Sequence, residues 1–141
     1  MQELVPNEHV QVYRLEAELL KLPQIDMPVA HDFCAGLYAR TLYIPAGTVL
    51  TGAVHRGESF FLVRRGDLIV STDDGLRLLH AGDMSVSKVG TKRAGVALTD
   101  VEVTTFHANP TNEMEPEKLW DLFTIPPPSK IIEQTKKDLL E

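Results

Sequence analysis

A chain of 141 residues can bury one hydrophobic core but not two, so we expect a single domain. With 43% hydrophobic and 24% charged residues, its composition is close to the average of folded globular proteins, so it suggests neither a disordered nor a fibrous chain. The formal net charge of −6 argues against a nucleic-acid partner, because contacts to phosphates draw on clustered Lys and Arg.

The single cysteine, Cys34, cannot form an internal disulfide, and the N-terminus lacks the basic and apolar regions of a signal peptide. No apolar run approaches the roughly 20 residues that span a bilayer. We therefore expect a cytoplasmic protein without a membrane partner, in which Cys34 is a small core residue. The basic pairs Arg64–Arg65 and Lys92–Arg93 are typical of solvated surface charge.

Residues 8–22 predict an amphipathic helix, because their apolar side chains recur at spacings of three and four. Pro23 ends this helix, and residues 1–28 form an N-terminal helical segment. The apolar face consists of Val12, Leu15, Leu19 and Leu20.

Between about Phe33 and Phe106, short runs of β-branched, aromatic and Leu residues alternate with Gly, Pro and Asp, which is typical of strands joined by tight turns. Parallel strands need crossover helices, and this region shows no strong helical pattern. The pattern therefore predicts an all-β fold, an antiparallel sandwich or barrel. The predicted strands cover residues 31–36, 38–44, 48–55, 59–65, 67–73, 75–80, 83–87, 93–99 and 101–107.

Three of the predicted joints carry specific turn residues. Asp74 and Gly75 match a two-residue hairpin turn, which needs a positive φ at its centre. Gly66 and Asp67 mark a second tight turn, and Asp100 marks a third. These turns support hairpins that join neighbouring antiparallel strands.

Residues 111–141 predict a C-terminal helical extension. Pro116 stands near the start of a short helix, in which Trp120 and Phe123 are expected to be core anchors. Prolines 126–128 form a stiff spacer, and Ser129 is a candidate N-cap for a last helix.

Two stretches, residues 44–70 and 79–95, resemble the two conserved motifs of the cupin superfamily. Gly47 and Gly66 fall at the two glycines of the first motif, and Gly82, Asp83 and Gly90 match the second. The resemblance extends over about residues 38–107. It implies a double-stranded β-helix, which is a jelly-roll barrel, over residues 29–110.

The resemblance also places the metal-ligand positions of the superfamily on this chain. They fall on Ala53, His55, Ser59 and Arg93, of which only His55 is a good metal donor. The guanidinium of Arg93 stays positively charged and would repel a divalent cation. We therefore expect a degenerate metal site and no cofactor. The alternative is a divalent metal bound by His55 and Glu58, if a bulge turned Glu58 inward.

A closer resemblance is to short cupin-like proteins of bacteriophages and prophages, which have no assigned activity. Residues 36–55, residues 87–95 and the acidic segment around residues 117–119 carry this resemblance. It implies a phage-associated protein, for which we expect a homodimer.

The candidate ligand-binding residues are His55, Glu58, Ser59, Arg93 and Tyr43. An inward Arg93 would suit a carboxylate or phosphate, so the expected ligand is a small anionic molecule or a carbohydrate. The alternatives are a hydrogen-bonded polar His55 without a ligand and an internal pair between Arg93 and Glu58. The first hypothesis is thus a non-catalytic or ligand-binding cupin.

The second hypothesis is an enzyme. His55 and Tyr43 are candidate catalytic residues, since some metal-independent sugar isomerases and epimerases of cupin fold use His and Tyr as base and acid. A metal-dependent cupin enzyme with non-standard ligands is the other form of this hypothesis. His80 and His107 are expected to be strand-end residues near solvent.

Overall fold

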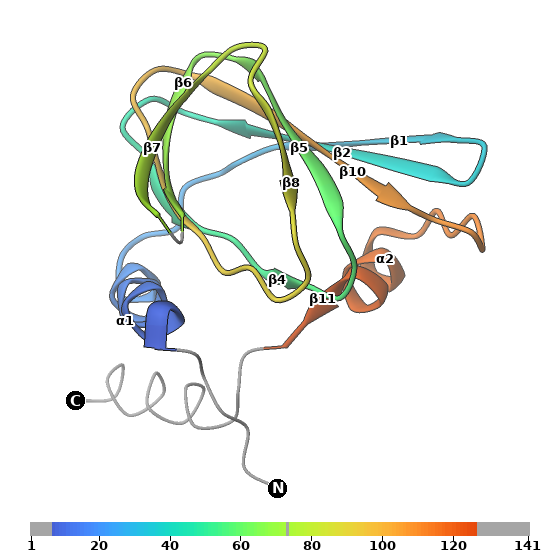
Figure 1. Ribbon diagram of the computed structural model, residues 1–141, viewed down its shortest axis with the longest axis horizontal. Coiled ribbons are helices and arrows are strands. Elements are labelled where there is room, and N and C mark those ends of the chain that lie inside the picture. Colours follow the sequence, from blue (N-terminus) through green and yellow to red (C-terminus); the bar gives the residue numbers. More distant parts are fainter. Residues whose placement is uncertain (1–6, 73, 127–141) are drawn as a thin grey trace, which may run out of the picture.

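The computed structural model describes residues 7–72 and 74–126, which form a barrel of antiparallel strands with one helix at each side (Figure 1). The predicted all-β, antiparallel architecture is confirmed, because every strand pair in these residues is antiparallel. The predicted helix after Ser129 lies outside the described residues.

Two sheets face each other across the barrel. The larger has the order β1-β2-β10-β5-β8 and the smaller the order β3-β9-β6-β7, while β4 pairs with β11. The strands of the larger sheet are β1 (Val29–Cys34), β2 (Leu37–Ile44), β10 (Val101–Ala108), β5 (Ser59–Arg65) and β8 (Met84–Ser87). Those of the smaller sheet are β3 (Val49–Thr51), β9 (Ala94–Ala97), β6 (Asp67–Thr72) and β7 (Gly75–His80). The short pair consists of β4 (Val54–His55) and β11 (Thr124–Ile125).

The single strand predicted for residues 48–55 is wrong in one respect. The chain breaks at Gly52 into β3 and β4, because β3 pairs with β9 of the smaller sheet whereas β4 pairs with β11. The last β3–β9 pair is Thr51 with Ala94, and just beyond it the Gly52 amide donates to the carbonyl of Arg93 at 2.9 Å. This break sends the chain across the barrel and brings His55 to its inner surface.

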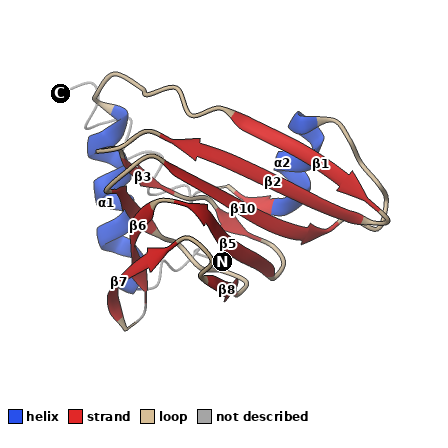
Figure 2. Cartoon of the chain, turned by 90° about the horizontal axis from the view of Figure 1, so that it is seen from above, coloured by secondary structure: helices blue, strands red, loops and turns tan. Residues whose placement is uncertain are grey.

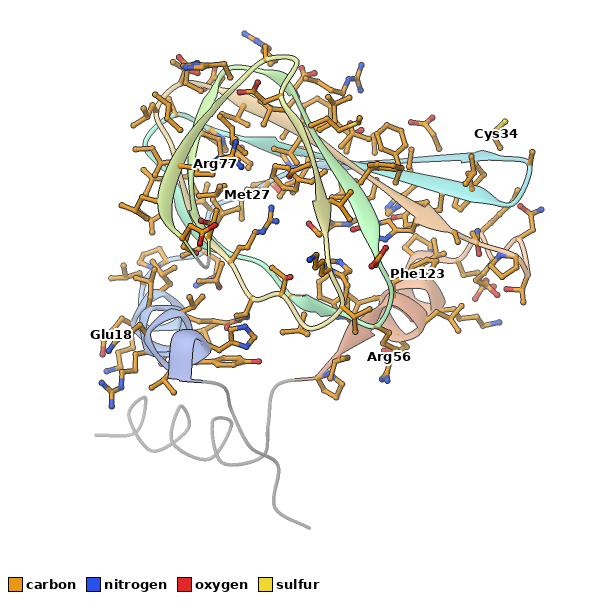
Figure 3. All side chains as sticks on the ribbon, in the orientation of Figure 1. Glu18, Met27, Cys34, Arg56, Arg77 and Phe123 are labelled. Atoms are coloured by element: carbon orange, nitrogen blue, oxygen red, sulfur yellow. The ribbon has the colours of Figure 1, made fainter. Side chains whose placement is uncertain are left out.

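The hydrophobic core fills the space between the two sheets and consists of alternate residues on their strands, as period-two side-chain placement requires. Partly buried Met27 packs against the core from the segment before β1 and lies within the barrel outline in Figure 3. The core residues are Ile44, Val63, Leu68, Val70, Leu79, Ala97, Val101 and Val103.

Helix α1 (Asn7–Leu20) and helix α2 (Pro116–Phe123) lie on opposite sides of the barrel (Figure 2). Lys92 fastens α1: its Nζ lies 2.6 Å from Glu16 Oε2, donates to the Gly52 carbonyl at 2.7 Å and lies 4.7 Å from the Tyr13 ring centroid. The expectation of a solvated Lys92 is wrong, because only 6% of the residue is exposed. In the described chain, neither helix has the length and apolar character needed to cross a membrane.

The hairpin formed by β1 and β2 extends beyond the barrel (Figure 1). Its turn places Ala35 at φ 46° and Gly36 at φ 77°. Cys34 lies beside this turn and points away from the protein (Figure 3). The expectation of a core cysteine is therefore wrong, because the strand end that carries Cys34 lies beyond the barrel core.

Gly66 joins β5 to β6 with φ 84°, a left-handed conformation that glycine adopts without steric cost. A Cβ atom at this position would lie 2.1 Å from the Asp100 carbonyl oxygen and 2.7 Å from Thr99 Oγ1. The amide of the next residue, Asp67, donates a hydrogen bond to Thr99 Oγ1 at 3.0 Å. The turn is therefore packed directly against the joint between β9 and β10.

Substitution Gly66→Ala is expected to lower the free energy of unfolding by roughly 2–5 kcal/mol, because it adds a steric clash to a strained φ. Gly47→Ala is the matched control: Gly47 has φ 82°, but nothing lies within 4 Å of its added Cβ. The control should lose only about 1–2 kcal/mol. Urea unfolding of both variants measures the difference, and equal losses would contradict the packing argument.

Candidate functional site

A cavity of about 390 Å³ lies between the two sheets of the barrel. The four positions that match the metal-ligand motif all line it, although they come from different parts of the chain: Ala53, His55, Ser59 and Arg93. The sequence comparison therefore brought together residues that do lie around one cavity. Their role in binding a ligand stays a prediction.

One end of this cavity is apolar and merges with the hydrophobic core. This surface can cover the hydrocarbon part of a ligand and remove it from water. The apolar lining residues at this end are Met27, Leu42, Ile44, Leu50, Phe61, Leu68 and Val103.

The pairing of β2 with β10 grades the cavity wall from apolar to polar. Ile44 pairs with Val101 and Leu42 with Val103, so this part of the wall is hydrocarbon. Two residues further along, Arg40 pairs with Thr105. Because side chains alternate along a strand, these pairs all face the barrel interior, and the register fixes the order of chemistry along it.

Beyond Arg40 the same wall becomes aromatic and polar. Tyr38 pairs with His107, and both side chains are buried, with 2% and 5% of the residue exposed. The two rings are stacked with centroids 5.7 Å apart. The expectation that His107 is a strand-end residue near solvent is wrong, because β10 continues past it and α2 covers this part of the sheet. His80, by contrast, is exposed at the end of β7, as expected.

The charged residues that line the barrel cavity, among those described, are Arg40 and Arg93, and none is Asp or Glu. Arg40 holds its guanidinium carbon 5.6 Å from the centroid of the Trp120 ring, and Arg93 holds its own 5.3 Å from that of Phe61. Each guanidinium therefore lies against an aromatic face, an arrangement that favours a cation. Burial lowers the pKa of Arg40, yet a guanidinium stays charged at neutral pH.

Ser59 adds a hydrogen-bonding group to the cavity. Its residue is 5% exposed, and its Oγ is buried without a hydrogen-bond partner in the described protein. Such an unpaired buried hydroxyl is uncommon, because its desolvation is not compensated. A ligand atom in the cavity would supply the missing partner.

The residues present do not fit the divalent metal that the superfamily motif implies. The four motif positions offer one imidazole, one hydroxyl, one methyl group and one guanidinium. Imidazoles and carboxylates are the usual donors for first-row metals, and a guanidinium opposes a cation. Within residues 7–72 and 74–126, no three His, Cys, Asp or Glu side chains form a group able to hold a metal ion.

A second, smaller cavity of about 220 Å³ lies under α2, against the inner face of β1, β2 and β10. It shares Val29, Arg40, His55 and Trp120 with the barrel cavity, so the two cavities adjoin at these residues. The other residues that line it are His31, Tyr38, His107, Pro116, Leu119, Phe123 and Thr124.

The polar groups of the small cavity form a connected cluster. His31 Nδ1 and the Tyr38 hydroxyl share a hydrogen bond of 2.6 Å, and His107 Nε2 and Thr105 Oγ1 share one of 2.8 Å. The rings of His55 and His107 are 5.3 Å apart between centroids. No hydrogen bond to the His55 ring occurs in the described part of the chain, so this ring has donor and acceptor capacity to spare.

Burial keeps the two facing imidazoles neutral. Burial, together with the smaller contributions of the neighbouring His55 and the charge of Arg40, lowers the pKa of His107 to about 4. Burial also lowers the pKa of His55, again helped by Arg40. At neutral pH His55 and His107 are therefore uncharged hydrogen-bonding groups beside the charge of Arg40.

Two of the residues proposed from sequence do not reach either cavity. Tyr43 lies on the outer face of β2 and is 37% exposed, because Leu42 and Ile44 on either side of it point inward. Glu58 is exposed on the segment before β5, and the register at Ser59 does not turn it inward. The phenol that approaches His55 and His107 belongs instead to Tyr38.

Helix α2 closes this end of the barrel through one aliphatic and two aromatic side chains. Leu119 is its buried anchor, with 2% exposed, and Phe123 stacks on Tyr38 and His107. Trp120 was expected to be a core anchor, but it is 49% exposed and lies over Arg40. The expectation is wrong for Trp120, because its ring lies at the rim of the two cavities and is half exposed.

The lowered pKa of His107 predicts acid sensitivity. The unfolded chain takes up this proton near pH 6.5 but the folded protein only near pH 4, so stability falls as the pH drops through this window. The loss is at most about 1.4 kcal/mol per pH unit for one group. Replacing His107 with Gln should flatten the dependence, measured by urea unfolding between these pH values.

The matched control for this measurement is His80→Gln. His80 is exposed, and a hydrogen bond to Asp67 raises its pKa, so it does not contribute to the loss of stability in acid. The control should keep the acid sensitivity of the wild type. A flat profile in the wild type, or an unchanged slope in His107→Gln, would contradict a neutral buried His107.

No model of a known protein family matches the chain, and no curated protein matches it either. Solved structures do. A cupin superfamily protein from Desulfitobacterium hafniense is 12% identical, with a TM-score of 0.51, and the match covers 65% of this chain and 85% of that one. KdgF from a Halomonas species is 19% identical, with a TM-score of 0.53, and the match covers 67% and 91%.

A variant of salicylate 1,2-dioxygenase from Pseudoaminobacter salicylatoxidans is 18% identical, with a TM-score of 0.55. This match covers 84% of the present chain and 37% of the larger enzyme. Identities this low show the shared fold. The resemblance to cupins is confirmed at that level: the chain has the cupin fold, an all-β jelly-roll barrel.

Proposed function

We propose that this protein binds a small organic anion with an apolar body inside its barrel. One observation carries the proposal: the 390 Å³ cavity is lined mainly by apolar residues together with Arg40 and Arg93, with no acidic residue among its described lining. Pockets that are mostly apolar and contain a few convergent polar groups are typical ligand sites.

Arg40 is the main anchor for the anion. No carboxylate among the described residues lies within ion-pair distance of its guanidinium, and Trp120 covers one face of that group. A guanidinium binds a carboxylate through two parallel hydrogen bonds, and burial strengthens such bonds. The ligand's charge would therefore balance a cation that the cavity wall leaves uncompensated.

Ser59 and His55 complete the polar end of the proposed site. The buried Ser59 Oγ lacks a partner, and the His55 ring has unused hydrogen-bonding capacity. Both groups are uncharged, so they add direction to the binding of an anion without opposing its charge. Tyr43 and Glu58 lie away from the cavities and have no part in this proposal.

The proposal predicts that octanoate binds and that neutral octanamide binds far more weakly. Arg40→Gln should weaken octanoate binding about 10–100-fold, because a hydrogen bond to a charged group contributes about 1.5–3 kcal/mol. Butanoate should also bind more weakly, since each buried methylene contributes up to about 0.8 kcal/mol. Isothermal titration calorimetry measures the affinity of the wild type for each of the three ligands and that of Arg40→Gln for octanoate.

Arg77→Gln is the matched control, because Arg77 is exposed on β7 and lines neither cavity. It should bind octanoate as the wild type does. Trp120 is the only tryptophan of the chain, so a change in its fluorescence on titration locates the ligand beside Arg40. Equal binding of octanoate and octanamide, or by Arg40→Gln and the wild type, would overturn the proposal.

The same chemistry predicts that the purified protein carries no stoichiometric transition metal. Changing Ser59 to His and Arg93 to His together should create a site that does, because three imidazoles would then surround the cavity position of His55. Elemental analysis by mass spectrometry, before and after dialysis against zinc, compares the two proteins. Metal bound at one equivalent in the wild type would support a metal-dependent enzyme with non-standard ligands instead.

A second candidate function is a metal-independent isomerase or epimerase. The observation that favours it is the cluster of Tyr38, His55 and His107, which sets a phenol beside two neutral imidazoles at the edge of the barrel cavity. A neutral imidazole can take a proton and a phenol can give one. The homodimer, the cytoplasmic location and the phage association expected from the sequence stay predictions.

A further inference from the structure

The small cavity under α2 has a chemistry that differs from that of the barrel cavity. Its hydrogen-bonding side chains include three imidazoles and one phenol, and the described residues that line it include no carboxylate. The small cavity is also lined by the hydroxyl of Thr124, which donates to the Trp120 carbonyl. Its charge is that of Arg40, which it shares with the barrel cavity. The walls are otherwise formed by the apolar face of α2.

These groups select an uncharged oxygen. A cation would be repelled by Arg40, and a second anionic group would find no further cation in the small cavity among the described residues. Imidazole and phenol can each donate or accept a hydrogen bond, so they suit a hydroxyl or a carbonyl oxygen. The His55 ring, which lines both cavities, has such capacity free.

The position of Arg40 determines where on the ligand that oxygen must be. Arg40 and His55 line both cavities, so an anion held there lies at their junction. A hydrocarbon chain can then run into the apolar end of the barrel. A substituent that enters the small cavity from the same junction must be attached to the carbon next to the carboxylate.

We propose that the small cavity is a second subsite of the same binding site, and that the ligand is an α-hydroxy or α-oxo acid with an apolar chain. This inference rests on the anion binding proposed above. Arg40 binds the carboxylate, His55 and His107 bind the α-oxygen, and the barrel covers the chain. His107 is held for this role by its hydrogen bond to Thr105.

Calorimetric titration of the full chain with octanoate, α-hydroxyoctanoate and ω-hydroxyoctanoate tests the subsite. The α-hydroxy acid should bind about three- to tenfold more tightly than octanoate, as expected for one net hydrogen bond. The ω-hydroxy acid should bind more weakly than octanoate, because its hydroxyl would be buried in hydrocarbon without a partner. This order does not depend on any variant folding.

In His107→Leu, octanoate should still bind, and the ratio of the affinities for α-hydroxyoctanoate and octanoate should fall to about one. His80→Leu, at an exposed histidine outside both cavities, should keep the preference. If octanoate and α-hydroxyoctanoate bind with equal affinity, the subsite is overturned and the proposed function stays intact. The same holds if folded His107→Leu still binds α-hydroxyoctanoate more tightly than octanoate. Absence of binding by all three acids would overturn the proposed function itself.

Discussion

A buried positive charge organises this end of the barrel. Arg40 is largely removed from water, and the described protein gives it an aromatic face on Trp120 in place of a carboxylate. Burying a charge without a partner is costly, so this guanidinium makes the cavity a favourable place for an anion. The same charge helps to keep His55 and His107 neutral, which leaves their nitrogens available for hydrogen bonds. The electrostatics of both cavities therefore depend on one side chain.

The strand register explains how Arg40 comes to stand between two kinds of surface. Along β2, the inward residues change from apolar Ile44 and Leu42 to Arg40 and then to Tyr38, and β10 provides matching partners at each step. A shift of one residue would reverse the faces and move all of these side chains to the outside. The hydrogen bond of 2.7 Å between Thr41 and Thr104, on the outer face of the same two strands, is consistent with this single register. The gradient of the cavity is thus a property of the sheet pairing.

Much of the fold could be predicted from sequence, because turn glycines and strand periodicity are local signals. The frame of the cupin motif also brought His55, Ser59 and Arg93 to one cavity, since those positions are fixed by the barrel turns. The sequence could not place Tyr38 or His107, because their facing depends on the β2–β10 register and on the covering helix. Alternation along residues 38–44 was the available signal, and it would have favoured Tyr38 over Tyr43. Strand β11 is too short to leave any pattern.

The neighbouring cations Lys92 and Arg93 show why their charge alone could not predict whether these side chains are exposed to solvent. Strand-like alternation sends Lys92 outward against Glu16 on α1, and it sends Arg93 inward over Phe61. Only 2% of the Lys92 side chain is exposed in its ion pair with Glu16. This pair therefore fixes the backbone next to position 93, which the motif resemblance assigns to a metal ligand. Because α1 anchors Lys92, the next side chain is held toward the cavity. A helix outside the barrel therefore helps to hold a guanidinium toward the cavity, at a position that the motif resemblance assigns to a metal ligand and where a positive charge opposes a divalent cation.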